Sequence, residues 1–277
     1  MTPDPAPTLR QLLTFYLEAG VDCALTEEPV NRLSDPELAP VAQQVDAPKS
    51  QRALPAAMPA SAAAPASRGE VAPPPEAAIA AAREAARTAP SLEALRALLE
   101  SFDGCALKFT ATRMVFGDGN PQARVMFVGE APGREEDIEG LPFVGRSGKL
   151  LDRMIAAIGL DRSSAYISNV IAWRPPGNRT PTPQETQICL PFIQRHIELV
   201  NPDVLVTLGN PSTQTLLSTR EGIMKTRGRW FDYDTGTRVI KAIATFHPAY
   251  LLRSPSYKRM SWQDLRAIAK ALEQAPS

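Results

Sequence analysis

The chain has 277 residues, in which 30 lysines and arginines balance 30 aspartates and glutamates, so its formal net charge is zero. This balance excludes a global basic field as the basis of nucleic-acid binding, although basic residues can still gather locally. No apolar run is long enough to cross a bilayer, so we expect no membrane partner, and the three widely spaced cysteines do not form a disulfide framework. Because the first residues lack the layout of a secretion signal, we expect a cytoplasmic protein.

The composition changes twice in the first third of the chain. Residues 8–19 carry apolar side chains at helical spacing, which predicts a small helical segment within residues 1–33. Residues 34–76 are rich in alanine, proline and serine, and such a segment buries too little apolar surface to offset its ordering entropy. We therefore expect a disordered linker at 34–76 and one folded domain at 77–277.

Within residues 77–277, short apolar runs alternate with helical patterns. The expected strands are 124–129, 166–171, 204–209 and 239–245, and the expected helices are 77–101, 147–158, 183–200, 211–218 and 257–274. Nearly continuous apolar strands separated by helices predict a parallel sheet covered on both faces. The expected fold is therefore α/β, a three-layer α/β/α sandwich around a central four-stranded parallel sheet.

Ligands of parallel sheets bind at the carboxyl ends of the strands, and three polar segments fall there. Residues 129–136, GEAPGREE, predict a tight turn after a buried strand. Asn169 ends the second strand, and its side-chain amide can match the edge of a pyrimidine. His247 follows the last strand, and Pro248 restricts it to extended geometry. Each signal alone also fits a structural role, but together they predict a hollow for a small planar polar ligand.

Four segments, in this order, closely resemble the family 4 uracil-DNA glycosylases. They are GEAPGREEDIEGLPFVG, NVIAWRPPGNRTPTPQE, the Leu-Gly end of the third expected strand, and HPAYLLR. The resemblance covers about residues 99–272. It implies a monofunctional uracil-DNA glycosylase of base excision repair, which flips uracil out of DNA and hydrolyses its N-glycosidic bond to leave an abasic site.

The resemblance also implies roles for individual residues. In catalysis, Glu130 would line the uracil pocket and the water site, Glu136 would orient water or stabilise the sugar cation, Asn169 would read the Watson–Crick edge, and His247 would donate to uracil O2. The implied substrate-binding residues are Ala131, Pro132, Gly133, Phe143 and Asn178, with Phe143 stacking on the base. The implied DNA contacts are Leu251, Leu252 and Arg253, which would form a wedge. Apart from the resemblance, Arg174 and Arg179 are basic residues in a loop near the expected site face, so we expect them to contact DNA phosphates. No metal ligand is implied for the reaction itself.

The chain departs from the family at the iron–sulfur cluster. Typical members hold a [4Fe–4S] cluster through four cysteines, and Cys105 and Cys189 match two of these positions. Phe102 and Trp173 stand at the other two, and neither ring supplies a thiolate. We therefore expect no cluster, with the two aromatic rings packed into the volume that it would fill.

Several alternatives remain open from the sequence. A uracil- or damaged-DNA-binding protein with little turnover would result if the altered loops misplace the pocket, and a glycosylase with shifted base specificity would use the same residues. A nucleotide-binding enzyme with a phosphate loop at 129–133 is disfavoured, because the acids that follow would repel phosphate. We expect a bacterial monomer that associates with the nucleoid, with residues 1–33 as a candidate contact for a repair-protein partner.

Overall fold

The computed structural model describes residues 75–274. The helix expected at 8–19, the segment 1–33 and nearly all of the linker 34–76 lie outside this range and stay predictions. Helix α2 (Pro75–Thr88) begins just inside the end of the expected linker. None of the described helices combines the length and the apolarity needed to span a bilayer.

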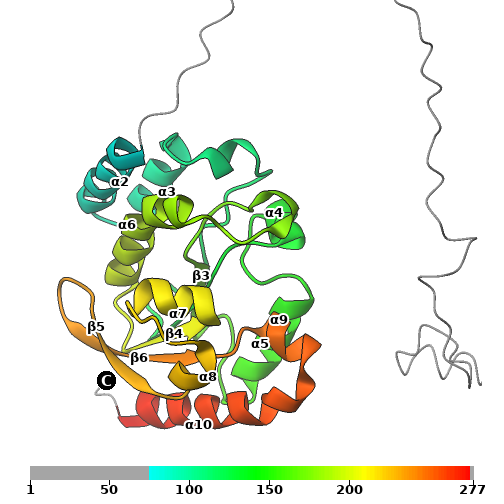
Figure 1. Ribbon diagram of the computed structural model, residues 1–277. Helices are drawn as coiled ribbons and strands as arrows, with labels where there is room; N and C mark the ends of the chain where they lie inside the picture. Colours follow the sequence, from blue (N-terminus) through cyan, green and yellow to red (C-terminus); the bar gives the residue numbers. More distant parts are fainter. Residues whose placement is uncertain (1–74, 275–277) are drawn as a thin grey trace, which may run out of the picture. The chain divides into compact units, whose positions relative to one another are not determined.

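A mixed six-stranded sheet forms the centre of the described domain (Figure 1). Its strands are β1 (Asp118–Gly119), β2 (Val125–Gly129), β3 (Tyr166–Asn169), β4 (Val204–Leu208), β5 (Trp230–Asp234) and β6 (Val239–Thr245), in the spatial order β1-β3-β2-β4-β6-β5. The four inner strands run parallel, which confirms the predicted α/β fold and its central parallel sheet. The antiparallel edge strands β1 and β5 were not predicted.

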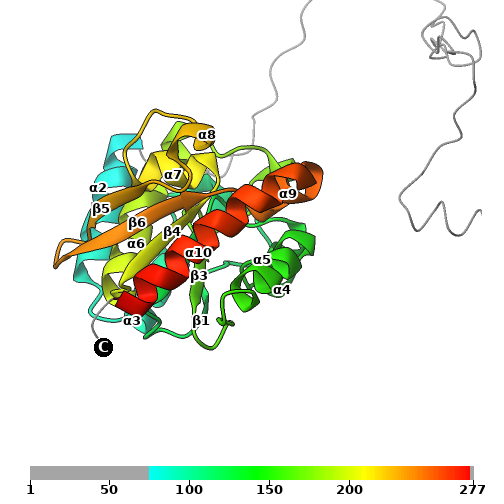
Figure 2. The ribbon, with the colours of Figure 1, turned by 90° about the horizontal axis from the view of Figure 1, so that it is seen from below.

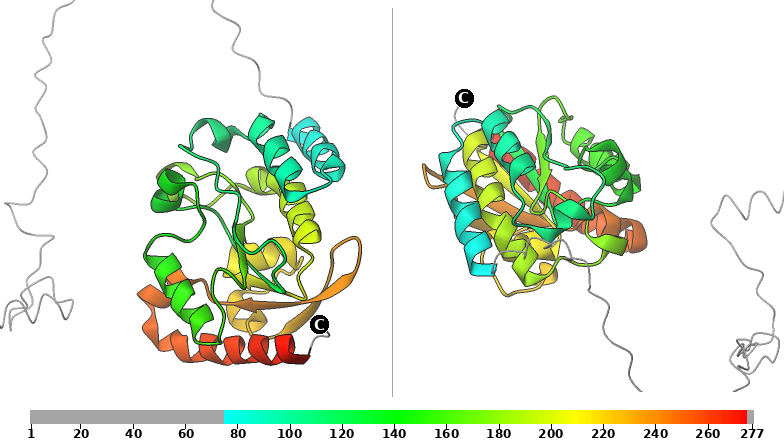
Figure 3. Two further views of the ribbon diagram at one scale, coloured as in Figure 1. Left: turned by 180° about the vertical axis from the view of Figure 1, so that it is seen from behind. Right: turned by 90° about the horizontal axis from the view of Figure 1, so that it is seen from above.

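Helices cover both faces of this sheet (Figures 2 and 3). One face carries α2, α3 (Leu92–Ser101), α6 (Pro183–Val200) and α7 (Asn210–Leu216), and the other carries α5 (Arg146–Ala156), α9 (Pro248–Arg253) and α10 (Lys258–Gln274). Side chains alternate between two hydrophobic clusters along each inner strand: Met126 and Val128 of β2 face the first, whereas Val125 and Phe127 face the second. The domain is thus a three-layer sandwich.

The single helix expected at 77–101 is two helices. Helix α2 ends at Thr88 and α3 begins at Leu92, with Pro90 between them. Ser91 caps α3 by accepting a hydrogen bond from the main-chain N–H of Ala94 at 3.2 Å. Proline disfavours helical geometry in the residue before it and lacks the N–H that a continuous helix needs, so the break belongs to Pro90.

The remaining elements are short and lie around the ends of the strands. They are α4 (Arg134–Glu139), α8 (Ile223–Thr226) and the 3₁₀ turns η2 (Ala106–Phe109), η3 (Pro176–Asn178) and η4 (Pro255–Tyr257). Helix α4 follows β2 directly, and η3 follows β3, so both sit beside the carboxyl edge of the sheet. This edge is where the candidate site is found.

Candidate active site

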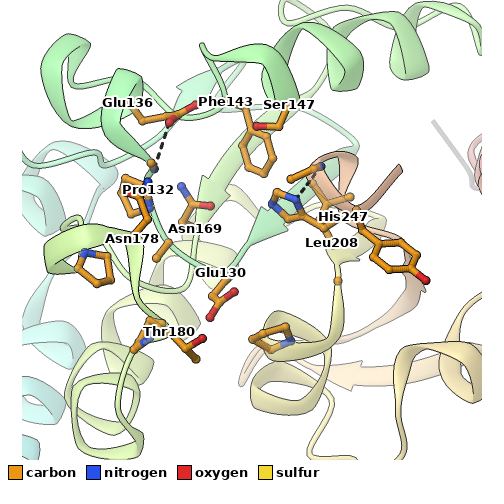
Figure 4. A pocket seen from close by; sticks show the side chains of 18 of the residues that line it. Glu130, Pro132, Glu136, Phe143, Ser147, Asn169, Asn178, Thr180, Leu208 and His247 are labelled. Carbon is orange, nitrogen blue, oxygen red and sulfur yellow. Dashed lines mark hydrogen bonds between the residues drawn. The ribbon is translucent and has the colours of Figure 1, made fainter. Parts of the chain in front are cut away.

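The carboxyl ends of the four parallel strands open into one pocket of about 590 Å³ (Figure 4). Each strand supplies one polar side chain to its lining: Glu130 follows β2, Asn169 ends β3, Asn210 follows β4 and His247 follows β6. In Figure 4 the side chains of Glu130, Asn169 and His247 point toward the same hollow. The parallel topology therefore gathers residues from across the sequence at one point.

Gly129, the last residue of β2, leaves room for the side chains of Asn169 and Phe143 at the pocket. A Cβ atom at this position would collide with the side-chain oxygen of Asn169 and would lie 2.7 Å from Cζ of Phe143. Any larger residue would push the Phe143 ring or the Asn169 amide out of the pocket. The glycine is thus required by a close approach of side chains at the strand end.

Phe143 is held in an unusual backbone conformation beside the pocket. Its φ of 55° lies in the left-handed region, which is costly for a residue with a bulky side chain. Arg162 donates one hydrogen bond to the main-chain oxygen of Phe143 and another, at 3.1 Å, to that of Pro142. Its guanidinium also pairs with Asp118 at 2.6 Å and Asp152 at 2.9 Å. Arg162 therefore anchors the loop that presents the ring.

His247 is a neutral hydrogen-bond donor. Its Nδ1 accepts a hydrogen bond from the main-chain N–H of Ala249 at 3.1 Å, so the ring proton lies on Nε2. Burial, helped by the positive charge of Arg253, lowers the pKa of His247 to about 4. Its ring centroid lies 5.4 Å from that of Phe143. The imidazole is therefore available near neutral pH as an uncharged Nε2–H donor beside an aromatic face.

The strand end that carries His247 is fixed by a buried ion pair. Thr245, the last residue of β6, donates a hydrogen bond to the carboxylate of Asp264 at 2.8 Å. Asp264, in α10, also accepts a hydrogen bond from Nε of Arg227 at 3.0 Å. A buried, fully bonded pair of this kind holds its neighbours in one arrangement, so α10 restrains the position from which His247 projects.

Main-chain N–H groups on both sides of α4 hold the carboxylate of Glu136. Glu136 accepts three main-chain hydrogen bonds, from Gly133 at 3.0 Å, Val144 at 3.1 Å and Gly145 at 3.0 Å. Its carboxylate thus joins the turn after β2 to the loop that carries Phe143. Although Glu136 lines the pocket, both oxygens already have partners, so the geometry favours a positioning role over the expected contact with water or sugar.

Three buried side-chain oxygens in the described residues have no hydrogen-bond partner, and all three line this pocket. They are Oε1 of Glu130, Oδ1 of Asn169 and Oδ1 of Asn210. Burial also raises the pKa of Glu130. Because an unpaired buried acceptor is costly, such a cluster is typical of a site that receives hydrogen-bond donors from a ligand or from water.

Comparisons with known proteins identify a family. Residues 116–266 match the model of the Uracil DNA glycosylase superfamily. The chain belongs to this superfamily. It is 46% identical over 153 residues to the Type-4 uracil-DNA glycosylase of Thermotoga maritima, which covers 55% of this chain and 78% of that protein. It is 40% identical over 170 residues to the Type-4 uracil-DNA glycosylase of Archaeoglobus fulgidus, which covers 60% of this chain and 85% of that protein.

Most of the predicted site residues meet at the pocket. Those that line it are Glu130, Ala131, Pro132, Gly133, Glu136, Phe143, Asn169, Asn178, Arg179, His247 and Arg253. Arg174 lies behind the lining, where its Nε donates to Oδ1 of Asn178 at 2.7 Å and so holds that residue. Arg179 is exposed but forms a two-point ion pair with Glu185, at 2.6 and 2.9 Å.

The structure places Leu251 in the core and not at the surface, so the prediction that it belongs to a wedge is wrong. The segment HPAYLLR forms helix α9, and this helix turns Leu251 into the second hydrophobic cluster, where it is 1% exposed. A side chain buried in the core is unavailable to enter a duplex. Leu252 is 36% exposed and Arg253 is also exposed, so these two residues keep the surface position that the wedge requires.

Several pocket residues were not predicted from the sequence. They include Arg134, Ser147, Asn210, Ile223 and Tyr250. Asn210 could have been predicted as a pocket residue, because it directly follows the Leu-Gly end of a strand in a parallel sheet. The role of Arg162 could not have been predicted, since it bonds to main-chain oxygens that only the folded loop brings near it.

The thiols within residues 75–274 do not fit a four-iron cluster. Cys105 and Cys189 are buried with their Sγ atoms 4.0 Å apart, and Phe102 and Trp173 pack in the same hydrophobic cluster. The Phe102 ring meets Phe192 edge-on at 5.0 Å. Over residues 75–274, no group of three or more histidine, cysteine or acidic side chains is arranged to hold a metal ion. Two thiols and two aromatic rings lack half of the thiolates that such a cluster needs.

Proposed function

We propose that the protein is a monofunctional uracil-DNA glycosylase that flips uracil into this pocket and hydrolyses its N-glycosidic bond. The observation that carries the proposal is the convergence of a neutral His247 donor, the unpartnered Oδ1 of Asn169 and the Phe143 ring on one hollow. Membership of the superfamily and the likeness to Type-4 uracil-DNA glycosylases support it.

Recognition rests on stacking and on one amide. A base in a duplex is inaccessible, so it must leave the stack and be received by an aromatic face and polar groups. Phe143 supplies the face, and Asn169 can accept from uracil N3–H while donating to O4. Cytosine presents an amino group where uracil presents O4, which would leave two donors facing each other. A buried mismatch of this kind gives steep discrimination.

Bond cleavage leaves negative charge on the base and positive charge on the sugar. The Nε2–H of His247 would donate to uracil O2 as charge develops there, a contribution of about 2.7–4 kcal/mol for a preorganised donor. Water then attacks C1′ as the C1′–N1 bond breaks, and the uracil anion leaves with the bonding pair. Glu130, with its unpartnered Oε1, would accept the proton of that water, and its charge would stabilise the sugar cation.

We also propose that the protein works without an iron–sulfur cluster. The packing of Phe102 and Trp173 beside only two thiols supports this proposal. The test is the iron content and visible absorbance of protein purified without oxygen. Stoichiometric iron together with a brown chromophore would contradict it.

The activity test uses an oligonucleotide with a single uracil. Wild-type protein should release free uracil in the presence of EDTA, leaving an abasic site that alkali cleaves, and Asn169→Ala and His247→Ala should be strongly impaired. Correct folding of each variant is checked by circular dichroism. Absence of product from folded wild-type protein would overturn the proposal, and tight binding without product would indicate a uracil-DNA-binding protein instead. Release of another deaminated base, but not uracil, would indicate shifted specificity.

We propose further that the domain acts as a monomer and that residues 1–33 contact another repair protein. One copy of the chain supplies every pocket residue named above, which supports the first part. Deletion of residues 1–74 should leave uracil release unchanged. A large loss of activity in that variant would instead indicate that the N-terminal residues dock on the domain.

A further inference from the structure

The pocket extends beyond the groups that the uracil chemistry uses. Glu130, Phe143, Asn169 and His247 line one part of it. The lining also includes residues of α7, α8 and α9 and their flanks, which we call the second part of the pocket: Asn210, Pro211, Ile223, Phe246, Tyr250 and Arg253. The volume of about 590 Å³ lies in the range of pockets that enclose drug-sized ligands, so it exceeds the need of a single pyrimidine.

Tyr250 presents an anchored aromatic ring to this second part. Its ring stacks on Phe246 with centroids 5.3 Å apart and planes at 23°, and Phe246 itself is buried. Tyr257 packs against both rings, at 5.3 Å from Phe246 and 5.4 Å from Tyr250. Tyr250 is half-buried and lines the pocket. A ring supported in this way offers a flat surface that needs little further ordering when a ligand binds.

Two polar groups accompany the ring. Arg253 follows Tyr250 by three positions on α9, which places the two residues on the same side of the helix. Arg253 is exposed, lines the pocket and has no ion-pair partner among residues 75–274. Asn210 brings a buried, unpartnered side-chain oxygen to the same region. An aromatic surface beside a free cation and an amide is the combination with which proteins hold single-stranded nucleotides.

We propose that this part of the pocket binds the nucleotide next to the flipped uracil, with its base stacked on Tyr250 and its phosphate at Arg253. The inference rests on the proposed function, because the neighbour reaches this region only if uracil occupies the first part. Continuity of the lining from His247 through Ala249 to Tyr250 and Arg253 supports this occupant. The strand would then be gripped at two successive residues.

A chemical double-mutant cycle tests the stack. Three single-stranded oligonucleotides carry one uracil: the first has ordinary neighbours, and the other two have a tetrahydrofuran residue, which lacks a base, on the 5′ or the 3′ side. Tyr250→Ala should lower kcat/KM by about five- to 150-fold on the first oligonucleotide. On one of the other two the loss should be several times smaller, because the base that stacks is already absent. Equal losses on all three oligonucleotides would overturn the proposal.

Two variants control for indirect effects. Tyr250→Phe keeps the ring and should keep the wild-type differences among the three oligonucleotides, whereas Trp230→Ala removes an exposed ring of β5 outside the pocket and should not alter them. If wild-type protein releases no uracil from any oligonucleotide, the proposed function fails. In that case the affinities of wild type and Tyr250→Ala for the same three oligonucleotides are measured by fluorescence anisotropy. A loss of affinity that is smaller on one oligonucleotide without the neighbouring base would still support the stack, and equal losses would overturn it.

Discussion

The Nδ1 of His247 accepts the main-chain N–H of Ala249, which fixes the tautomer of the imidazole. Protonation of Nδ1 would break this bond. Burial and the positive charge of Arg253 also lower the pKa of His247 to about 4. The only other histidine, His196, is buried, and its pKa is lowered to about 3. We therefore expect neither imidazole to titrate between pH 5.5 and 8. Nitrogen chemical shifts from NMR should report a neutral Nε2–H form of His247 throughout this range.

The same NMR measurement on Arg253→Gln provides the control. Removing the nearby cation should raise the pKa of His247, whereas His196 should not respond. A titration of wild-type His247 near its ordinary value of about 6.5 would contradict the buried, neutral donor.

Glu130→Gln should separate activity from stability. Burial raises the pKa of Glu130, so its charged form is disfavoured in the folded state, and this penalty grows as the pH rises through the folded pKa. At pH 8 the variant should therefore be at least as stable as wild type in urea unfolding. Because Glu130 is the proposed acceptor of the proton of water, its replacement should lower kcat by about 10²–10⁴-fold. A variant with wild-type kcat would assign that proton to another acceptor.

Glu136→Gln should behave in the opposite way. Its carboxylate accepts hydrogen bonds from Gly133, Val144 and Gly145, and an amide cannot accept all three. Hydrogen bonds to a charged group contribute about 1.5–3 kcal/mol each, so we expect a clear loss of unfolding free energy together with reduced activity. Glu139→Gln, an exposed change on the same helix, is the matched control. Reduced activity at wild-type stability would favour a direct catalytic role for Glu136.

Leu251 and Leu252 should differ although they are adjacent. Leu251→Ala removes a core side chain and should cost about 2–5 kcal/mol of unfolding free energy. Leu252→Ala should change stability by no more than about 0.5 kcal/mol, because the side chain lies at the surface. We expect Leu252→Ala to lower uracil release from double-stranded DNA more than from single-stranded DNA. Equal activity losses on both substrates would exclude it as a wedge.

The proposed contact between Arg253 and a phosphate should contribute to the salt dependence of DNA binding. A residue that contacts one phosphate contributes about one unit to the slope of log affinity against log salt concentration. Arg253→Gln should reduce this slope by about one, as measured by fluorescence anisotropy on uracil-containing DNA. Arg266→Gln, an exposed change on α10 outside the pocket lining, should leave the slope unchanged. Identical slopes for wild type and Arg253→Gln would exclude the phosphate contact.

The sequence predicted the parallel core because its four inner strands are short apolar runs separated by helical patterns. The edge strand β5 escaped prediction, since only Tyr233 in Trp230–Asp234 is buried and its composition resembles a loop. The break at Pro90 was overlooked because alanine and leucine spacing continues on both sides of it. Local periodicity thus identified the elements that bury apolar surface and missed those that are defined by their neighbours.

The candidate site followed the same division. Asn169 and His247 were predicted because they stand at strand ends, where a parallel sheet binds its ligands. The partners of Glu136 could not be predicted, since Val144 and Gly145 reach its carboxylate only through the fold of the intervening loop. The burial of Leu251 could not be predicted, because a seven-residue motif does not reveal whether it forms a loop or a helical turn. The direction of a side chain near a surface depends on that difference.

The origin of the four polar side chains from four different strands has a consequence for protein synthesis. The last of them, His247, follows β6, and α10 then fixes the end of that strand through Asp264. A chain still attached to the ribosome therefore lacks a complete pocket until β6 and α10 have emerged. A polypeptide that stops before α10 would lack Asp264, which holds the strand end beside His247.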